Sequence, residues 1–378
     1  MQEDSTISTS LALTTFAKDE GHHSASQVGT GAQAAAALQP RPAGSPHGAR
    51  GYSTPSMQAI LAVTVPFFAL VLAGWLAARQ GVLPESAIPG LNAYVLYFAL
   101  PCMLLRFGMG TPVLQLLNPF VLAVYLLCAL MIVFFTIAVS INHKIGLKDA
   151  SFGALVAAFP NTGFMGVPLL VALLGPAAAG PVICTILADL FVTSSLCIAL
   201  SQLQGAGEHG ARTAALRAVR GALSNPLPWA IALGAVLSVT GVTFYGPVDT
   251  VVRLLADSAT PVALFTIGAV LWRAGQHAHT RTPVAHYLPV ALIKLFVHPL
   301  LVLLAGGAAQ QLGAPLSGFQ LVVLTLAAAL PSASNVSLLT ERYGADSGRV
   351  ARIIMASTVL ALPTFSALAW AFGVRPGS

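Results

Sequence analysis

The chain has very little charge for its length. Only 8% of its 378 residues are charged, 18 basic and 12 acidic, whereas 56% are hydrophobic and the mean hydropathy is +0.81. A soluble domain carries about 25% charged residues, so these few cannot cover a water-facing surface. The scarcity excludes a soluble enzyme and a disordered protein. The net charge of +6 does not indicate nucleic-acid binding, because the basic residues lie mostly in short loops between apolar runs.

The sequence also lacks the usual motifs of catalysis and metal binding. It contains no G-x-S-x-G, H-E-x-x-H or G-x-x-x-x-G-K-[ST] pattern, which argues against an enzyme and against ATP-driven pumping. We interpret His277, His279 and His286 as solvated loop residues, so no metal and no cofactor are predicted. The cysteines lie in apolar runs without a C-x-x-C pair and are expected to be free thiols: Cys102, Cys128, Cys184 and Cys197.

Ten apolar segments follow residue 56. Each is close to the length of about 20 residues that crosses a bilayer as a helix. The sequence therefore predicts an all-α polytopic membrane protein embedded in the lipid bilayer. The expected transmembrane segments are 57–78, 86–107, 118–141, 150–173, 180–203, 223–243, 248–273, 284–307, 318–341 and 349–373.

Two stretches lie outside the apolar segments. Residues 1–56 are rich in Ala, Gly, Ser, Thr and Pro and begin with acidic residues, which is wrong for a signal peptide. We expect this tail to be disordered; the alternative is that the start site is assigned too early, since Met57 opens the first clean helix. The linker 204–222 divides the segments five and five, so the predicted halves are 57–203 and 223–374.

Loop charge predicts the orientation. Eleven Lys and Arg residues lie in or beside the odd-numbered loops, whereas the opposite side, leaving out the tail, has Arg106, Arg253 and Arg375. Cytoplasmic loops carry the excess of positive charge. We expect a multi-pass protein of the cytoplasmic (inner) cell membrane with both termini on the non-cytoplasmic side.

The two halves contain matching sequence patterns. Pro101 and Gly108 in the second segment have the same P-x6-G spacing as Pro261 and Gly268 in the seventh. The fourth segment contains A-A-F-P at 157–160, and the ninth contains A-A-L-P at 328–331. Because five is an odd number, homologous halves must insert with opposite orientations. The patterns predict two inverted five-helix repeats, a common design of secondary transporters.

The fourth and ninth segments contain helix-breaking residues in mid-span. The fourth reads F-P-N-T-G-F-M-G-V-P from residue 159, and the ninth reads L-P-S-A-S-N-V-S from residue 330. Pro and Gly weaken a helix, and the freed backbone groups must meet protein, water or a ligand. A substrate site is one interpretation, and a simple proline kink is the other. The candidate substrate-binding residues are Asn161, Gly163, Gly166, Ser334 and Asn335.

These motifs resemble the auxin efflux carrier family. The N-T-G-F-M-G-V-P run, the P-S-A-S-N run and the Y-F-A-L-P stretch carry the resemblance, which covers about residues 57–374. Bacterial members are often described as transporters of malonate or other organic acids, and the short linker here resembles that branch.

The resemblance implies a ten-helix inverted repeat similar to sodium/proton antiporters, with helices four and nine crossing at their breaks. It implies that Asn161 and Asn335 contact substrate and that transport proceeds by an elevator-like shift. It also implies a possible homodimer. The prolines expected at helix breaks or lining the cleft are Pro101, Pro160, Pro168, Pro261 and Pro331.

Three ionisable residues lie within predicted segments, where a charge is costly. Asp189 shares a helix face with Thr185 and Thr193 and is a candidate site for a coupling proton or sodium ion, or else a hydrogen-bonded packing residue. Lys294 and His298 are candidates for an anion path or for pairing with Asp189; Lys294 could instead extend to the interface. Arg253 and Asp257, four residues apart, are expected to form a surface ion pair.

The leading hypothesis is a secondary transporter of small organic anions, either malonate- or malate-like carboxylates or auxin-like acids. A sodium-coupled symporter or a cation/proton antiporter of the same fold is the alternative. A channel and an intramembrane enzyme using Ser332, Ser334 or Asp189 with His298 as base are less favoured, the latter because no nucleophile motif is present.

Overall fold

The computed structural model describes residues 56–112, 118–203, 220, 223–276 and 282–376. Nearly all of the tail 1–56 and the linker 204–222 lies outside this range, as do His277 and His279. The described chain is helical and contains no strand, only an isolated bridge between Pro160 and Ser332. The expectation of an all-α protein is confirmed.

Seven helices among the described residues are long and apolar enough to cross a membrane. Three shorter apolar helices accompany them, at Thr162–Leu174, Pro226–Thr240 and Gly318–Ala328. The seven long helices are Met57–Arg79, Glu85–Gly110, Pro119–Ser140, Pro176–Gln202, Gly246–Gln276, Val284–Gln311 and Ser347–Ala371. Together they describe a polytopic membrane protein, and each of the ten predicted segments overlaps one or more helices.

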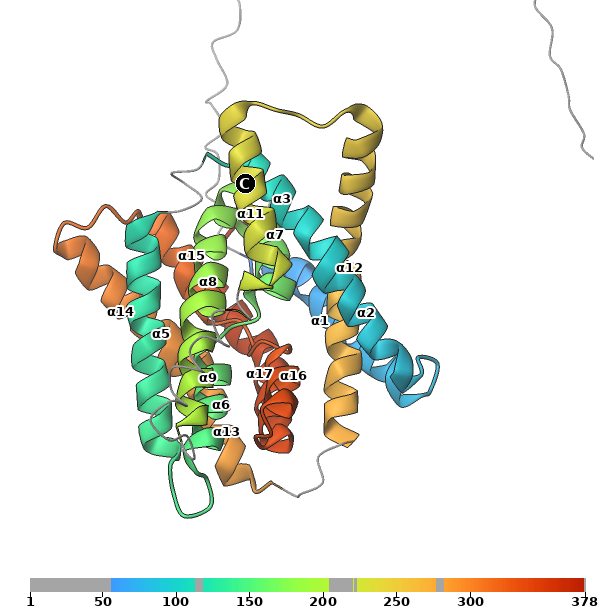
Figure 1. Cartoon of the computed structure of the whole chain (residues 1–378). Helices are drawn as coiled ribbons and strands as arrows, with labels where there is room; N and C mark the ends of the chain where they lie inside the picture. The colour runs from blue at the N-terminus through green and yellow to red at the C-terminus, as the bar shows by residue number, and fades with distance from the viewer. Residues whose placement is uncertain (1–55, 113–117, 204–219, 221–222, 277–281, 377–378) are drawn as a thin grey trace, which may run out of the picture. The chain divides into compact units, whose positions relative to one another are not determined.

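Figure 1 shows the helices in chain order. The first half contains α1 (Met57–Arg79), α2 (Ile88–Tyr94), α3 (Leu100–Gly110), α5 (Pro119–Ser140), α6 (Leu147–Ala158), α7 (Val167–Leu174), α8 (Ala179–Ala188) and α9 (Ser194–Gln202). The second half contains α11 (Pro226–Thr240), α12 (Gly246–Gln276), α13 (Val284–Leu292), α14 (His298–Gln311), α15 (Gly318–Ala328), α16 (Val336–Arg342) and α17 (Ser347–Ala371). Short 3-10 turns lie at η1 (Glu85–Ala87) and η4 (Pro176–Ala178).

Local sequence signals fix several helix starts. The side chain of Asn118 accepts hydrogen bonds from the amides of Phe120 and Val121, and Asn225 does the same for Leu227. A proline follows each asparagine at the first helical position, where its missing N–H costs nothing. Ser317 begins α15 with a complete capping box.

Four long segments contain a π-helical turn. These turns are η2 (Val95–Ala99), η3 (Thr162–Gly166), η5 (Asp189–Thr193) and η6 (Ile293–Val297). A π-turn inserts a residue into the helical ladder and often occurs at functional sites. Here η3 follows the interruption of the fourth segment, and η5 and η6 carry Asp189 and Lys294.

Glycines bring two helix pairs into close contact. An added Cβ at Gly74 of α1 would lie 1.9 Å from the carbonyl oxygen of Phe265 in α12, and one at Gly268 would lie 1.9 Å from that of Val71. The α3–α11 pair repeats this arrangement, because Gly108 and Gly234 face each other. Small residues permit such close backbone approach between membrane helices.

Arg349 joins several helices near the start of α17 and is only 2% exposed. Its guanidinium donates to the carbonyl oxygens of His286 at 2.8 Å and Asp149 at 2.9 Å, and lies 3.5 Å from the Ser140 hydroxyl. The α17 start is therefore fastened to α13 and to the α5–α6 connection. Gly153 leaves the space for this side chain, since an added Cβ would lie 2.6 Å from the guanidinium.

Candidate functional site

The two interrupted segments cross at their breaks. In the fourth segment, α6 ends at Ala158 and η3 begins at Thr162; in the ninth, α15 ends at Ala328 and α16 begins at Val336. The intervening stretches run antiparallel. The backbone N–H of Asn161 donates to the Pro331 carbonyl at 2.8 Å, and the backbone N–H of Ala333 donates to the Phe159 carbonyl at 3.0 Å. The interruptions therefore satisfy part of each other's backbone, as buried irregular chain within a membrane must.

The asparagine side chains remain without partners at this crossing. Asn161 is 3% exposed, and Asn335 is partly buried immediately before α16. Neither side chain caps the helix that follows it, and neither side-chain amide has a hydrogen-bond partner among the described residues. Neither side-chain amide is among the described polar atoms that are fully buried without a partner, so both groups remain accessible to a ligand or to water.

The other candidate residues differ in their surroundings. Gly166 packs tightly, because an added Cβ would lie 2.7 Å from the Leu330 Cδ1 atom across the crossing. Nothing lies within 4 Å of the corresponding position at Gly163. Ser334 is 5% exposed, and its carbonyl accepts a hydrogen bond from the Ser337 hydroxyl at 2.8 Å. Gly166 therefore has a packing role that Gly163 lacks.

Only two of the five candidate prolines lie in helix interruptions. These are Pro160 and Pro331, which both lie in the extended stretches of the crossing. Pro101 and Pro168 lie in the first turns of α3 and α7, directly after π-turns. Pro261 lies inside α12, a helix of 31 residues that is not interrupted at this proline. A proline removes one backbone hydrogen bond, but the neighbouring turns and the packing against α1 hold α12 continuous.

A cavity of about 270 Å³, here called the inner cavity, lies beside the crossing. Phe159, Phe164 and Asn335 line it from the crossing itself, whereas Asn161, Gly163 and Ser334 do not. A second space of about 770 Å³, the outer cavity, shares four lining residues with it. The shared residues are Leu96, Asn225, Arg342 and Tyr343.

Asp189 is fully buried in a separate polar cluster. Its carboxylate accepts hydrogen bonds from the Tyr125 hydroxyl at 2.8 Å and the Thr193 hydroxyl at 3.1 Å. Thr185, which was expected on the same helix face, donates to the Val182 carbonyl. Among the described residues no ion pair joins Asp189 to Lys294. Sequence spacing identified Thr193 but could not find Tyr125, which lies 64 residues away on α5.

Lys294 and His298 are also fully buried, so the lysine does not extend to the interface. The Lys294 Nζ atom donates to the carbonyl of Ala328 at 2.6 Å and lies 3.3 Å from His298 Nδ1. Ala328 is the last residue of α15, and a cation complements the carbonyl end of a helix. The His298 ring packs 5.9 Å from Tyr125, which connects this pair to the Asp189 cluster.

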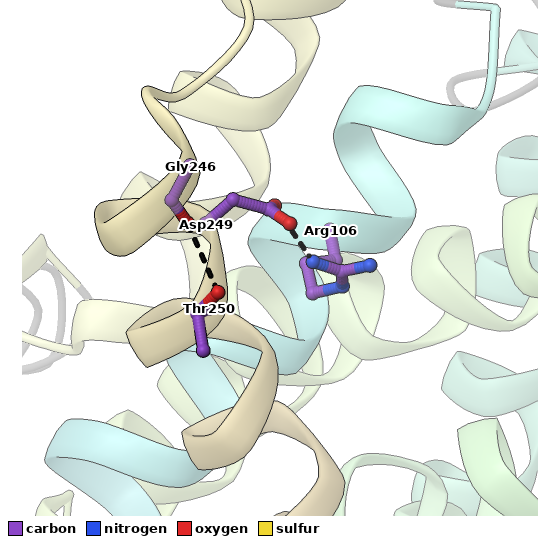
Figure 2. A network of polar contacts seen from close by, with 4 residues as sticks. All are labelled: Arg106, Gly246, Asp249 and Thr250. Atoms are coloured by element: carbon purple, nitrogen blue, oxygen red, sulfur yellow. Dashed lines mark hydrogen bonds and ion pairs between the residues drawn. The ribbon is translucent and has the colours of Figure 1, made fainter. Parts of the chain in front are cut away.

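The expected ion pair between Arg253 and Asp257 is absent from the described residues. Figure 2 shows the pair that forms nearby instead: Arg106 of α3 and Asp249 of α12 lie 2.9 Å apart. Arg106 lies on the neighbouring helix α3 and reaches the Asp249 carboxylate. Spacing along one helix could not reveal this contact. Among the described residues no three His, Cys, Asp or Glu side chains are grouped to hold a metal, and none of the four cysteines forms a disulfide.

Comparison with known proteins decides the family. Residues 59–369 match the membrane transport protein family, which is most of the chain. The chain belongs to this family. The resemblance to auxin efflux carriers is thereby confirmed, and the protein is a membrane transporter of that family.

Individual relatives agree with this assignment. The transporter is 27% identical to a Rhizobium meliloti (strain 1021) protein named "Putative malonate transporter" over 319 residues, 82% of this chain and 95% of the relative. It is 25% identical to the "Uncharacterized transporter YfdV" of Escherichia coli (strain K12), over 74% of this chain and 87% of that protein. An "Uncharacterized transporter" of Methanothermobacter thermautotrophicus is 26% identical over 81% of this chain and 95% of its own length.

Proposed function

We propose that this protein is a secondary transporter of small organic anions and that the crossing of the interrupted helices is its substrate site. The observation that carries the proposal is the pair of unpartnered side-chain amides, those of Asn161 and Asn335, at a crossing beside a cavity. An amide NH2 group donates to a carboxylate and replaces part of its hydration. The malonate in the name of the Rhizobium relative makes malonate-like carboxylates the first substrates to test.

We further propose the inverted five-helix repeat, with halves 57–203 and 223–374. Pro101 and Pro261, Gly108 and Gly268, and Gly74 and Gly234 are each separated by 160 positions. The glycine contacts follow the same relation: α1 packs on α12 through Gly74 and Gly268, and α11 packs on α3 through Gly234 and Gly108. Equal spacing together with equivalent packing supports two related halves.

The packing also supports an elevator-type mechanism. The helices α1, α3, α11 and α12 pack closely on one another, whereas the interrupted segments pack mainly with α5, α8, α9, α13, α14 and α17. We infer that the first group forms a scaffold and the second a core that carries the substrate site. The inner cavity lies beside both groups. Asn92 of α2 and Leu96 of η2, which lead into α3 and pack on α12, line it from one side, and Asn335 lines it from the other.

Asp189 is the proposed site of ion coupling, by a proton or by sodium. It is a buried carboxylate held by two hydroxyls and connected through Tyr125 to the Lys294–His298 pair. Lys294 already has a partner in the Ala328 carbonyl, so we assign it, with His298 beside it, to the support of the α15 end and not to ion binding. Intramembrane carboxylates often mark proton or ion relays.

The remaining features follow from the transport proposal. The protein lies in the cytoplasmic membrane with both termini outside, and a homodimer formed through the scaffold is consistent with its exposed apolar surface, for example Trp229, Leu233 and Val236 of α11. In this orientation the outer cavity, which is named for its place relative to the crossing, opens on the cytoplasmic side of the membrane. Arg220 and Arg342, which line it, lie on the side richer in basic residues.

Uptake of labelled malonate into proteoliposomes tests the function, with malate, succinate and indole acetate as competitors. Saturable uptake with counterflow, inhibited by the dicarboxylates, is the expected result. Uptake that does not saturate would indicate a channel. Absence of malonate uptake together with sodium or proton exchange would favour the cation/proton antiporter and reject the organic-anion proposal.

A further inference from the structure

The described residues that line the two cavities carry charge of only one sign. Among the described residues, Arg342 is the sole charged one that lines the inner cavity, and the outer cavity adds Arg220. No described carboxylate lines either space. The neighbouring Glu341 is directed elsewhere, since it pairs with Arg273 at 3.6 Å. A cavity with this lining attracts anions and repels cations.

Arg342 itself has no ion pair or hydrogen bond in the described part of the chain. The contrast with Arg349, which is buried and donates to two backbone carbonyls, is informative. The guanidinium of Arg349 is occupied in holding helices together. That of Arg342 is unoccupied beside a space of ligand size, where it can accept a carboxylate.

The position of Arg342 relative to Asn335 sets the size of the ligand. Asn335 immediately precedes α16, and Arg342 ends it seven residues later. Seven residues are about two helical turns, or roughly 10 Å along the axis, so the two residues share a helix face. Both line the inner cavity. Helical side chains lean toward the helix N-terminus, so the long arginine side chain shortens the gap to a distance that a small molecule can bridge.

We propose that Arg342 is a specificity-determining residue that binds the second carboxylate of a short dicarboxylate, while the first lies at the crossing beside Asn335. This inference rests on the proposed function and narrows its substrate class from organic anions to dicarboxylates. A guanidinium holds a carboxylate by two parallel N–H···O bonds, a geometry that a lysine ammonium does not reproduce. A monocarboxylate leaves Arg342 without a partner.

A matched control separates this role from general loop charge. Arg79 also lies on the side rich in basic residues, but it stacks 5.0 Å over the Trp75 ring and lines neither cavity. Arg79→Gln therefore removes the same charge without changing the cavity. It should leave malonate uptake and its competition profile as in the wild type.

The test uses the full-length protein in proteoliposomes with labelled malonate. The competitor is monomethyl malonate, which keeps the carbon skeleton but has one carboxylate masked as an ester. In the wild type, unlabelled malonate should inhibit at concentrations about tenfold or more below those of the monoester, as expected for loss of one charge-assisted contact. Arg342→Gln should raise the KM for malonate about tenfold. In this variant malonate and its monoester should inhibit at similar concentrations, and Arg342→Lys should give intermediate values.

The outcomes distinguish the two proposals. If Arg342→Gln keeps the wild-type preference for malonate over its monoester, the role of Arg342 is wrong while the transport function stands. Equal inhibition of the wild type by both compounds would also overturn the dicarboxylate inference. Absence of saturable uptake of malonate, malate and succinate by the wild type, together with sodium or proton exchange, overturns the organic-anion proposal and this inference with it. If Arg342→Gln does not reach the membrane, an unchanged preference in Arg342→Lys overturns the inference.

Discussion

Two helix crossings in this protein are built in opposite ways. The α1–α12 crossing is closed by Gly74 and Gly268, with no room for one additional carbon atom. Backbone hydrogen bonds join the crossing of the interrupted segments, and the side-chain amides of Asn161 and Asn335 remain without partners. Close apolar packing stabilises a membrane protein, whereas unpartnered polar groups destabilise it. We infer that the first crossing maintains the fold, in keeping with the proposal that the second binds substrate.

The largest effect is expected from adding one carbon to the tight crossing. The Cβ of Gly268→Ala would lie 1.9 Å from the Val71 carbonyl and 2.6 Å from the Trp75 amide nitrogen, both backbone atoms. Such a clash should cost about 3 kcal/mol or more and remove most folded protein from the membrane. Gly307→Ala, with nothing within 4 Å, is the control. Thermal unfolding and membrane expression measure the difference; equal stability of the two variants would refute the structural role of the crossing.

A large functional effect with little loss of fold is expected at Asp189. Asp189→Asn keeps an oxygen acceptor for one of the Tyr125 and Thr193 hydroxyls, places an NH2 group beside the other, and removes the charge. If this carboxylate carries the driving ion, concentrative malonate uptake should be lost while exchange across the membrane continues. Asp257→Asn, at an exposed position of α12, is the control. Normal accumulation by Asp189→Asn would reject the coupling role.

A moderate effect should distinguish the two glycines of the interrupted fourth segment. Gly166→Ala places a carbon 2.7 Å from Leu330, a fully buried side chain with little room to move, and should cost about 1–3 kcal/mol by overpacking. Gly163→Ala meets open space and should leave stability unchanged within about 0.5 kcal/mol. Paired thermal unfolding curves provide the measurement, and equal shifts in both variants would contradict the packing described.

The smallest effect is expected at the ion pair between α3 and α12. Arg106 and Asp249 are 38% and 47% exposed, so solvent screens their attraction. Arg106→Gln should lower stability by less than about 1 kcal/mol and leave transport unchanged. A double-mutant cycle with Asp249→Asn measures the coupling energy. A coupling of several kcal/mol would mean that this pair, and not the glycine contacts, holds the scaffold together.

The apolar segments of the sequence and its helix-breaking residues predicted much of the fold. Pro160 and Pro331, with their small polar neighbours, located both interruptions because a proline cannot continue the helical ladder. The family resemblance put Pro261 among the prolines at helix breaks or lining the cleft, and α12 passes through it unbroken, so it is not at a break. Polar residues also precede Pro261, so the difference lies in the tertiary contacts. The stretches at Pro160 and Pro331 hydrogen-bond to each other, whereas α12 packs continuously against α1.

Contacts between distant segments could not be predicted from one sequence. Tyr125 and Asp189, Lys294 and Ala328, and Arg106 and Asp249 each join residues of different helices. Spacing along a helix reports which residues share a face, but not which helix packs against that face. The role proposed for Arg342 was missed for this reason, since in the sequence it is one more basic residue beside a loop.

Malonate binding to purified protein, measured by isothermal titration calorimetry, tests most directly whether the polar crossing is the substrate site. The comparison uses wild type, Asn161→Ala, Asn335→Ala and Asn118→Ala, the last removing only the cap of α5. The account predicts that both crossing variants lose malonate affinity by tenfold or more, about 1.4 kcal/mol. Asn118→Ala should lose about 1 kcal/mol of stability and keep its affinity. Wild-type affinity in Asn161→Ala and Asn335→Ala would contradict the account.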